Sequence, residues 1–165
     1  MRFVIILGVF CAFLFIGMYI YRGTTARRRF FADMLQFILH LSVEINFSRA
    51  KVLSVITRYR GSYGIHLRTL LAVYENLINS RNEITAPAVR DGIWKGLREQ
   101  EAEQVTEFFV NLGRHNAGEE ERKLIASREK FGNLHTVSTK DVKERGELYL
   151  KLFIILGIGA VILLL

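Results

Sequence analysis

The longest apolar run of the chain lies at its start. It extends from Phe3 to Tyr21 and reads FVIILGVFCAFLFIGMYIY, nineteen residues without a charge. As a helix at ~1.5 Å per residue this run is about 28 Å long, close to the ~30 Å hydrocarbon core of a bilayer. A helix that is apolar all round does not suit the surface of a soluble domain. The pattern therefore predicts an N-terminal transmembrane anchor over residues 1–22.

Basic residues on one side of this run predict its orientation. Arg22, Arg27, Arg28 and Arg29 follow it, whereas Arg2 and the amino terminus are the charges before it. The positive-inside rule then places the N-terminus outside and the following residues in the cytoplasm. A cleaved signal peptide is the alternative, but the run exceeds the usual apolar region of about 7–15 residues and no small-x-small cleavage site follows.

A second apolar run, from Leu152 to Leu165, has fourteen uncharged residues. As a helix it is about 21 Å long, which is short of a full span. Residues 148–150 extend it if Lys151 reaches the headgroup level. The sequence predicts a C-terminal membrane segment over residues 148–165, and whether it crosses or only enters the bilayer stays open.

Between the two runs, apolar positions recur at steps of three and four, which is typical of amphipathic helices. A turn is expected at residues 46–48, with Ser48 as the N-cap of the next helix, and Gly61 and Gly64 predict a loop. One helix from Glu119 is favoured over two helices broken at Gly132. The predicted helices cover residues 26–46, 49–59, 65–79, 85–97 and 99–112, and continue from residue 119. The fold class is therefore all-α: an antiparallel helical bundle over residues 23–147, in the cytoplasm, anchored to the membrane at both ends.

Charge changes this picture in one respect. The formal net charge is +7, and residues 22–98 hold 13 basic against 5 acidic side chains. A basic half beside a membrane is most simply an attraction to anionic lipids. No zinc motif, RNP motif or GXXG loop supports nucleic-acid binding.

Cys11 is the single cysteine, so no disulfide forms within the chain, which fits a reducing compartment.

The motifs of enzymes and metal sites are missing from the sequence. There is no Gly-rich phosphate loop, nucleophile elbow or His/Cys cluster, so we expect no catalytic residue, no cofactor and no metal. His40 and Glu44 stand four apart, a spacing that suits a metal on a helix, but a third ligand is lacking and a local hydrogen-bonded pair is favoured.

Four glutamates give the predicted helix over residues 99–112 a polar side. Glu99, Glu101, Glu103 and Glu107 form a candidate partner-binding face, and a merely solvated side is the alternative.

Trp94, the one tryptophan, is expected in the core rather than as a binding platform. His66 is expected to be a solvated residue at a helix end.

The order of features resembles the family of stage III sporulation protein AB over essentially the whole chain. The matching points are Glu44 and Ile45 before an aromatic turn at Phe47, a lone tryptophan at position 94, and Leu112 with Gly113 before an acidic helix start. Gly157 in the apolar tail completes them. The chain departs from the pattern after the turn, where residues 49–51 replace the usual proline.

This resemblance implies a function. The family's middle part is similar to the cytoplasmic helical domain of the F-type platform proteins of type II secretion and type IV pilus machines. It implies a non-enzymatic scaffold in the mother-cell membrane around the forespore, with a secretion-type hexameric ATPase, other channel subunits and membrane lipids as partners. Self-association stays open. The alternative function is a free-standing membrane-active protein, such as a holin-like pore, or a tail-anchored stress protein.

Overall fold

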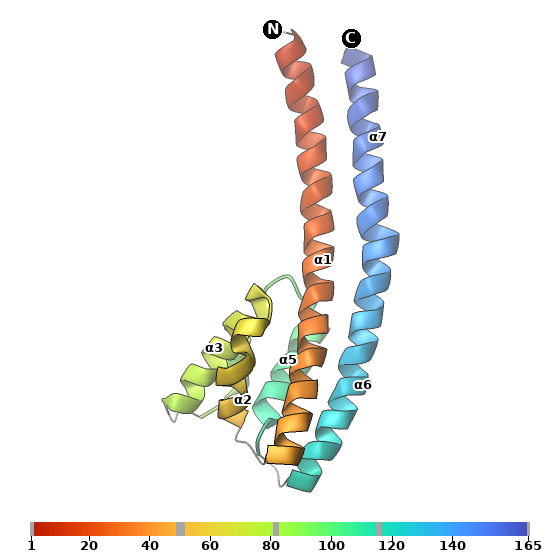
Figure 1. Cartoon of the computed structure of the whole chain (residues 1–165). Coiled ribbons are helices and arrows are strands. Elements are labelled where there is room, and N and C mark those ends of the chain that lie inside the picture. The colour runs from red at the N-terminus through yellow and green to blue at the C-terminus, as the bar shows by residue number, and fades with distance from the viewer. Residues whose placement is uncertain (1, 49–51, 81–82, 115–116, 165) are drawn as a thin grey trace. The chain divides into compact units, whose positions relative to one another are not determined.

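Helices make up every regular element in the part of the chain that the structure, a computed structural model, describes: residues 2–48, 52–80, 83–114 and 117–164 (Figure 1). The all-α fold class is therefore confirmed. In chain order the elements are α1 (Arg2–Ser48), α2 (Val52–Tyr59), the 3₁₀ turn η1 (Arg60–Ser62), α3 (Ile65–Asn79), α4 (Ala86–Arg90), α5 (Glu99–Asn111), α6 (Ala117–Asp141), the π-helical segment η2 (Val142–Gly146) and α7 (Glu147–Leu164).

Two compact units divide these helices. The hairpin unit comprises Met1–Arg28 and Thr136–Leu165, and the bundle unit comprises Arg29–His135. Helices α1 and α6 contribute residues to both units.

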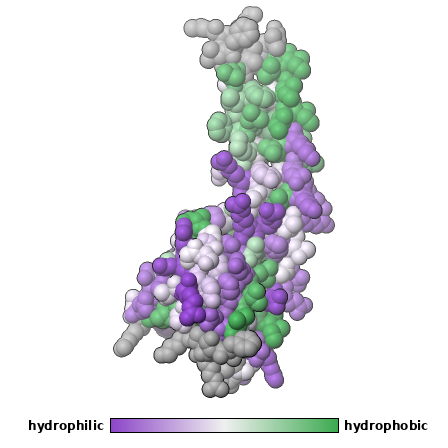
Figure 2. Space-filling view, viewed as in Figure 1, coloured by the Kyte–Doolittle hydropathy of each residue, from purple (hydrophilic) through white to green (hydrophobic). Residues whose placement is uncertain are grey.

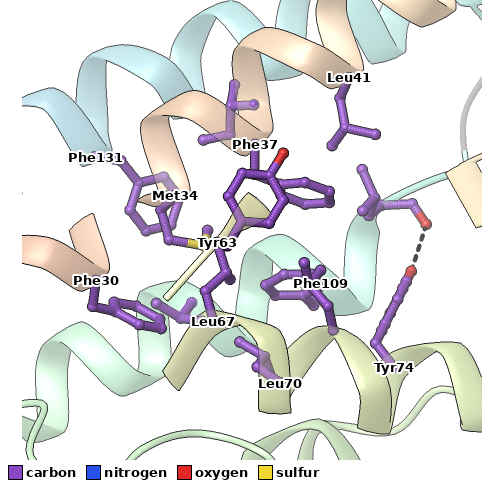
Figure 3. Close-up of a cluster of buried hydrophobic side chains, with 14 of the residues drawn as sticks. Phe30, Met34, Phe37, Leu41, Tyr63, Leu67, Leu70, Tyr74, Phe109 and Phe131 are labelled. Carbon is purple, nitrogen blue, oxygen red and sulfur yellow. Dashed lines mark hydrogen bonds between the residues drawn. The ribbon is translucent and has the colours of Figure 1, made fainter. Parts of the chain in front are cut away.

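An aromatic cluster forms the centre of the bundle unit (Figure 3). The ring of Phe37 on α1 stacks on Phe109 of α5, with centroids 5.9 Å apart, and meets Tyr63 edge-on at 5.9 Å. Phe109 also contacts the ring of Tyr74 on α3, 5.1 Å away. Offset and edge-on pairs add stabilisation beyond the buried area. The fully buried apolar side chains around them include Phe31, Met34, Ile38, Leu41, Ile56, Leu67, Leu70, Leu71, Val105 and Phe131.

Helix α1 packs against the rest of the bundle unit through apolar residues that recur with the helical period. Phe30, Met34, Phe37 and Leu41 are spaced three or four apart and are at most 1 % exposed, so they share one face. The predicted turn at residues 46–48, with Ser48 as N-cap, is wrong because α1 runs to Ser48. Asparagine and serine are only mildly unfavourable in a helix, and no glycine or proline stands there to end it.

Helix α3 has the predicted bounds, whereas α4 is much shorter than predicted. Thr85 takes the N-cap position with Pro87 in the first turn, as expected, although its side chain makes no capping hydrogen bond. The helix ends at Arg90. A Cβ on Gly92 would lie 3.0 Å from Cβ of Val73, so the chain approaches α3 closely there and turns. Trp94 therefore lies outside any helix.

Helix α6 is continuous through Gly132, which confirms the single predicted helix. No restart occurs at Ser138, because the helix continues to Asp141 and then widens into η2. A Cβ on Gly146, the last residue of η2, would lie 2.7 Å from the Thr24 hydroxyl, so this segment packs against α1 within the hairpin unit.

The hairpin unit is a pair of antiparallel helices, in which the start of α1 and the end of α7 lie side by side (Figure 1). The rings of Phe13 and Phe153 are 6.3 Å apart. Gly17 and Gly157 are both buried in this seam. A Cβ on Gly17 would lie 3.1 Å from Cβ of Phe153. Small residues thus allow close helix approach, as at helix interfaces in membranes.

Replacing Gly157 with valine is expected to open this seam, because a Cβ there lies 3.0 Å from the Phe10 ring. Gly159→Val is the matched control, since nothing lies within 4 Å of its Cβ. Both glycines belong to α7.

The measurement is disulfide formation in the full chain. It uses the Phe13→Cys and Phe153→Cys variants combined with Cys11→Ser. We expect the yield to fall severalfold with Gly157→Val and to stay unchanged with Gly159→Val. Equal yields in the two variants would contradict a glycine-dependent seam.

Exposed apolar side chains gather on the hairpin unit where the start of α1 and the end of α7 lie side by side, the green area of the face in Figure 2. Phe15 is 71 % exposed on α1 and Ile155 is 68 % exposed on α7. Within the residues that the structure describes, no helix has both the length and the apolar character that a membrane crossing requires. The side chain of Phe3 and the whole of Leu165, which bound the predicted membrane segments, lie outside the described residues.

Candidate partner-docking surface

Helix α5 carries the predicted acidic face, and one of its four glutamates is not part of the surface. The carboxylate of Glu101 accepts a hydrogen bond from the Arg98 backbone N–H at 3.0 Å. A glutamate three residues after the N-cap commonly closes a helix start in this way. Glu101 is consequently only 4 % exposed, and the prediction that it lies on the polar side is wrong.

The other three glutamates of this face are exposed. Glu99 forms an ion pair with Arg90. Glu107 accepts a hydrogen bond from the Lys130 ammonium at 3.1 Å. Exposed pairs of this kind contribute little stability, so these glutamates can exchange partners at small cost. Their role as a partner-binding face stays a prediction.

A groove of about 260 Å³ runs between α5 and α6. Its apolar wall comes from Phe108 and Leu112 on one side and Leu124 and Phe131 on the other. The rings of Phe108 and Phe131 meet edge-on with centroids 5.6 Å apart. The remaining lining residues are Gln104, Glu107, Asn111, Glu120, Lys123, Ala126, Ser127 and Lys130.

Two buried acceptors in this groove are without a hydrogen bond. Oε1 of Gln104 and Oε2 of Glu120 are inaccessible to solvent and find no partner among the described residues. The other carboxylate oxygen of Glu120 accepts the Gly113 N–H at 2.9 Å, which holds the side chain in place. A buried unsatisfied acceptor is costly and calls for an explanation.

The corner at Leu112 and Gly113 connects α5 to the start of α6. Gly113 has φ 77°, the left-handed conformation that is typical of a glycine after the end of a helix. The Leu112 carbonyl accepts a hydrogen bond from the Tyr74 hydroxyl at 3.3 Å (Figure 3). Burial raises the pKa of Tyr74 to about 12, so this hydroxyl keeps its proton and remains a donor. The corner is thus fixed on both sides, by Tyr74 and by Glu120.

Replacing Gly113 with alanine is expected to destabilise the bundle unit by about 1–2 kcal/mol, because an L-residue is strained at this φ. A steric clash does not contribute, since the nearest atom to a Cβ at Gly113 is a side-chain carbon of Val52 at 3.5 Å. Gly118→Ala is the control, because Gly118 lies in α6 with nothing within 4 Å. Urea unfolding of the full chain followed by circular dichroism measures both. A Gly113→Ala variant as stable as Gly118→Ala would contradict the assignment.

His40 and Glu44 do not form the predicted local pair or a metal site, because both bind residues after α1. Nδ1 of His40 lies 2.7 Å from the Tyr63 hydroxyl, and its ring stacks on Tyr59 at 4.1 Å. Glu44 accepts hydrogen bonds from Arg58 at 2.7 Å and from the Tyr59 hydroxyl at 2.9 Å. Within the described ranges, no three His, Cys, Asp or Glu side chains gather as metal ligands.

Trp94 is half-buried and stacks on the ring of His66, with centroids 4.1 Å apart. It is therefore not one of the core residues, and His66 is not the freely solvated residue expected from the sequence. Burial lowers the pKa of His66 below its usual value.

The fluorescence of Trp94 is expected to change with pH. An imidazolium in ring contact quenches an indole, so the signal should fall as pH decreases, with a midpoint below the usual histidine value of about 6.5. The stability from neutral His66 is present above that value and is lost as pH falls through the folded-state pKa. Because Trp94 is the one tryptophan, its emission in the full chain measures this titration. His66→Gln should abolish the transition, and His135→Gln should keep it. A transition that survives His66→Gln would overturn the assignment.

Sequence reasoning missed the role of Glu120, although a signal was present. Residues 120, 124, 127 and 131 are spaced three or four apart, so Glu120 shares a helix face with the apolar residues Leu124 and Phe131. Glu120 therefore belongs to the inward face of α6, where it is 5 % exposed. Its neighbours Glu119 and Glu121 are exposed. The side chain of Ile45, one of the family-pattern positions, lies outside the described residues.

The fold and this surface define an all-α protein that combines a helical bundle with an apolar helical hairpin. The chain belongs to the stage III sporulation protein AB family, whose model matches residues 2–165. No curated protein and no solved structure matches the chain. The family resemblance seen in the sequence is thereby confirmed, while the similarity to secretion platform domains stays a prediction.

Proposed function

We propose that the chain is a non-enzymatic platform subunit of a sporulation-specific channel complex. In this proposal the hairpin unit enters the mother-cell membrane around the forespore, and the bundle unit docks a cytoplasmic secretion-type ATPase. Membership of the stage III sporulation protein AB family supports the link to sporulation. The ATPase partner follows from the similarity to secretion platform domains that the family resemblance implies for the middle part of the chain.

The observation that carries the membrane part is the apolar surface of the hairpin unit. Large side chains are exposed on both helices, and contiguous apolar surface of this kind marks an interaction with a membrane or another protein. They are Leu7, Phe15, Ile16, Met18, Tyr19, Leu148, Tyr149, Leu152, Ile155, Leu156, Ile158 and Ile162. In a bilayer these side chains contact lipid, while Gly17 and Gly157 hold the two helices together.

Positive charge near one end of the apolar surface supports the same arrangement. The hairpin unit carries Arg22 and Arg28 on α1, and Lys143 and Lys151 after α6. Basic residues beside an apolar segment favour the cytoplasmic, anionic face of a membrane.

The docking part of the proposal is tested by charge reversal. Glu103→Lys with Glu107→Lys removes the exposed acidic face of α5, whereas Glu121→Lys with Glu129→Lys makes the same charge change on α6. Both pairs are exposed, so neither variant should unfold the bundle unit.

The measurement is co-purification of the secretion-type ATPase with the tagged full chain from sporulating cells. We expect recovery to fall about tenfold for the α5 variant only, since like charges across an interface are strongly unfavourable. Unchanged recovery would argue against this face, and absence of the ATPase from the unmodified chain would contradict the platform function.

A further inference from the structure

We propose that the groove between α5 and α6 is the docking site for an amphipathic helix of a partner protein, which inserts one lysine or arginine side chain beside Glu120 and Gln104. The inference deepens the platform function, on which it rests, by naming where a partner binds and what chemistry the partner carries.

The apolar lining of the groove suits the apolar face of a helix. Its walls are the side chains of Phe108, Leu112, Leu124 and Phe131, contributed by two neighbouring helices. The outer lining residues, among them Asn111 and Ala126, are exposed, so the groove reaches the surface of the bundle unit. Helix-in-groove recognition uses such a channel between two helices.

The two unsatisfied oxygens indicate which chemical group a partner places in the groove. Glu120 and Gln104 both line the groove, and Oε2 of Glu120 and Oε1 of Gln104 are buried without a hydrogen-bond partner among the described residues. Glu120 is 5 % exposed and is positioned by the Gly113 N–H, so its free oxygen is fixed rather than swinging into solvent.

A cationic side chain suits this pair of oxygens best. A guanidinium offers five donors and an ammonium three, and neither is an acceptor, so either group suits a carboxylate oxygen or an amide oxygen. The nearby ammonium of Lys130 is bound to Glu107. The charged residues that line the groove are Glu107 and Glu120 with Lys123 and Lys130, so the case for a cation rests on the unsatisfied oxygen of Glu120.

Glu120→Gln is the variant that isolates this chemistry. The amide oxygen of glutamine can still accept the Gly113 N–H, which preserves the corner after α5. The amide NH₂ then replaces the unsatisfied carboxylate oxygen, so a donor faces the incoming cation. Glu121→Gln is the matched control, because it makes the same change at an exposed neighbour that does not line the groove.

The experiment places the photo-cross-linking residue p-benzoylphenylalanine at Ser127, a groove-lining position, in the full chain during sporulation. A second chain carries it at Arg128, which is exposed and does not line the groove. Cross-linked peptides are identified by mass spectrometry, and the yield is compared between Glu120→Gln and Glu121→Gln.

We expect a product from position 127 and not from position 128. Its partner peptide should carry apolar residues at helical spacing and a lysine or arginine among them. Glu120→Gln should lower its yield about tenfold, and Glu121→Gln should leave it unchanged. No product, a cross-link to lipid, a peptide without a basic residue, or a yield unaffected by Glu120→Gln overturns the inference. If the ATPase still co-purifies in any of these cases, the inference fails and the platform function stands.

Discussion

Replacing Phe109 with alanine is expected to destabilise the bundle unit by about 3–5 kcal/mol, the usual cost of removing a buried phenylalanine. Phe109 is fully buried and contacts the rings of Phe37, Tyr74 and Phe108, which come from three helices. A loss of this size is a large part of the stability of an ordinary domain.

Chemical unfolding of the full chain, followed by the fluorescence of Trp94, measures this loss within the bundle unit. Ile125→Ala is the control, since Ile125 lies on α6 and is 62 % exposed. It should change stability by about 0.5 kcal/mol or less. A Phe109→Ala variant within 1 kcal/mol of this control would contradict the aromatic centre described above.

Replacing Asp141 with alanine is expected to weaken the hairpin unit by about 3 kcal/mol, because it removes the carboxylate that binds the buried guanidinium of Arg27. Nη1 of Arg27 donates to Oδ2 of Asp141 at 2.6 Å, and the two side chains are 7 % and 15 % exposed. Nε of Arg145 is 3.8 Å from the same carboxylate, but Arg145 is mostly exposed, so loss of this contact costs little stability. The cost therefore comes from the guanidinium of Arg27.

The double variant Arg27→Met with Asp141→Leu provides the matched control. Replacing a buried ion pair with apolar side chains is often neutral, so the double variant should recover most of the loss. Hydrogen exchange of residues 136–150 in the full chain measures both. We expect exchange about 100-fold faster for Asp141→Ala, since each 1.4 kcal/mol is a factor of ten. An unchanged exchange rate for Asp141→Ala would contradict a stabilising role of the buried ion pair. A double variant that exchanges as fast as Asp141→Ala would contradict it as well.

The helices of the bundle were predictable where local signals and tertiary packing agree. The spacing of Leu67, Leu70, Leu71 and Tyr74 predicted α3, and all four side chains are buried. Gly113 predicted the end of α5 because the left-handed turn there needs a residue without a Cβ.

Errors arose where a contact distant in sequence decided the structure. The segment after Arg90 has a helical pattern, yet the close approach of Gly92 to Val73 ends α4 early. Trp94 then meets His66 instead of the core.

The candidate docking surface was only partly visible in the sequence. The acidic character of α5 was correctly anticipated, but the position of Glu101 depends on its hydrogen bond to the Arg98 N–H. The role of Glu120 depends on Gly113, which is seven residues away and meets it only when α5 and α6 pack. Spacing along one helix shows which side chains share a face, and it does not show what that face meets.

Our proposal that the hairpin unit anchors the chain in the membrane is tested by alkaline carbonate extraction of membranes from sporulating cells that contain the tagged full chain. We expect the chain to stay in the membrane pellet after extraction. Release of the intact chain into the carbonate supernatant would contradict the proposal.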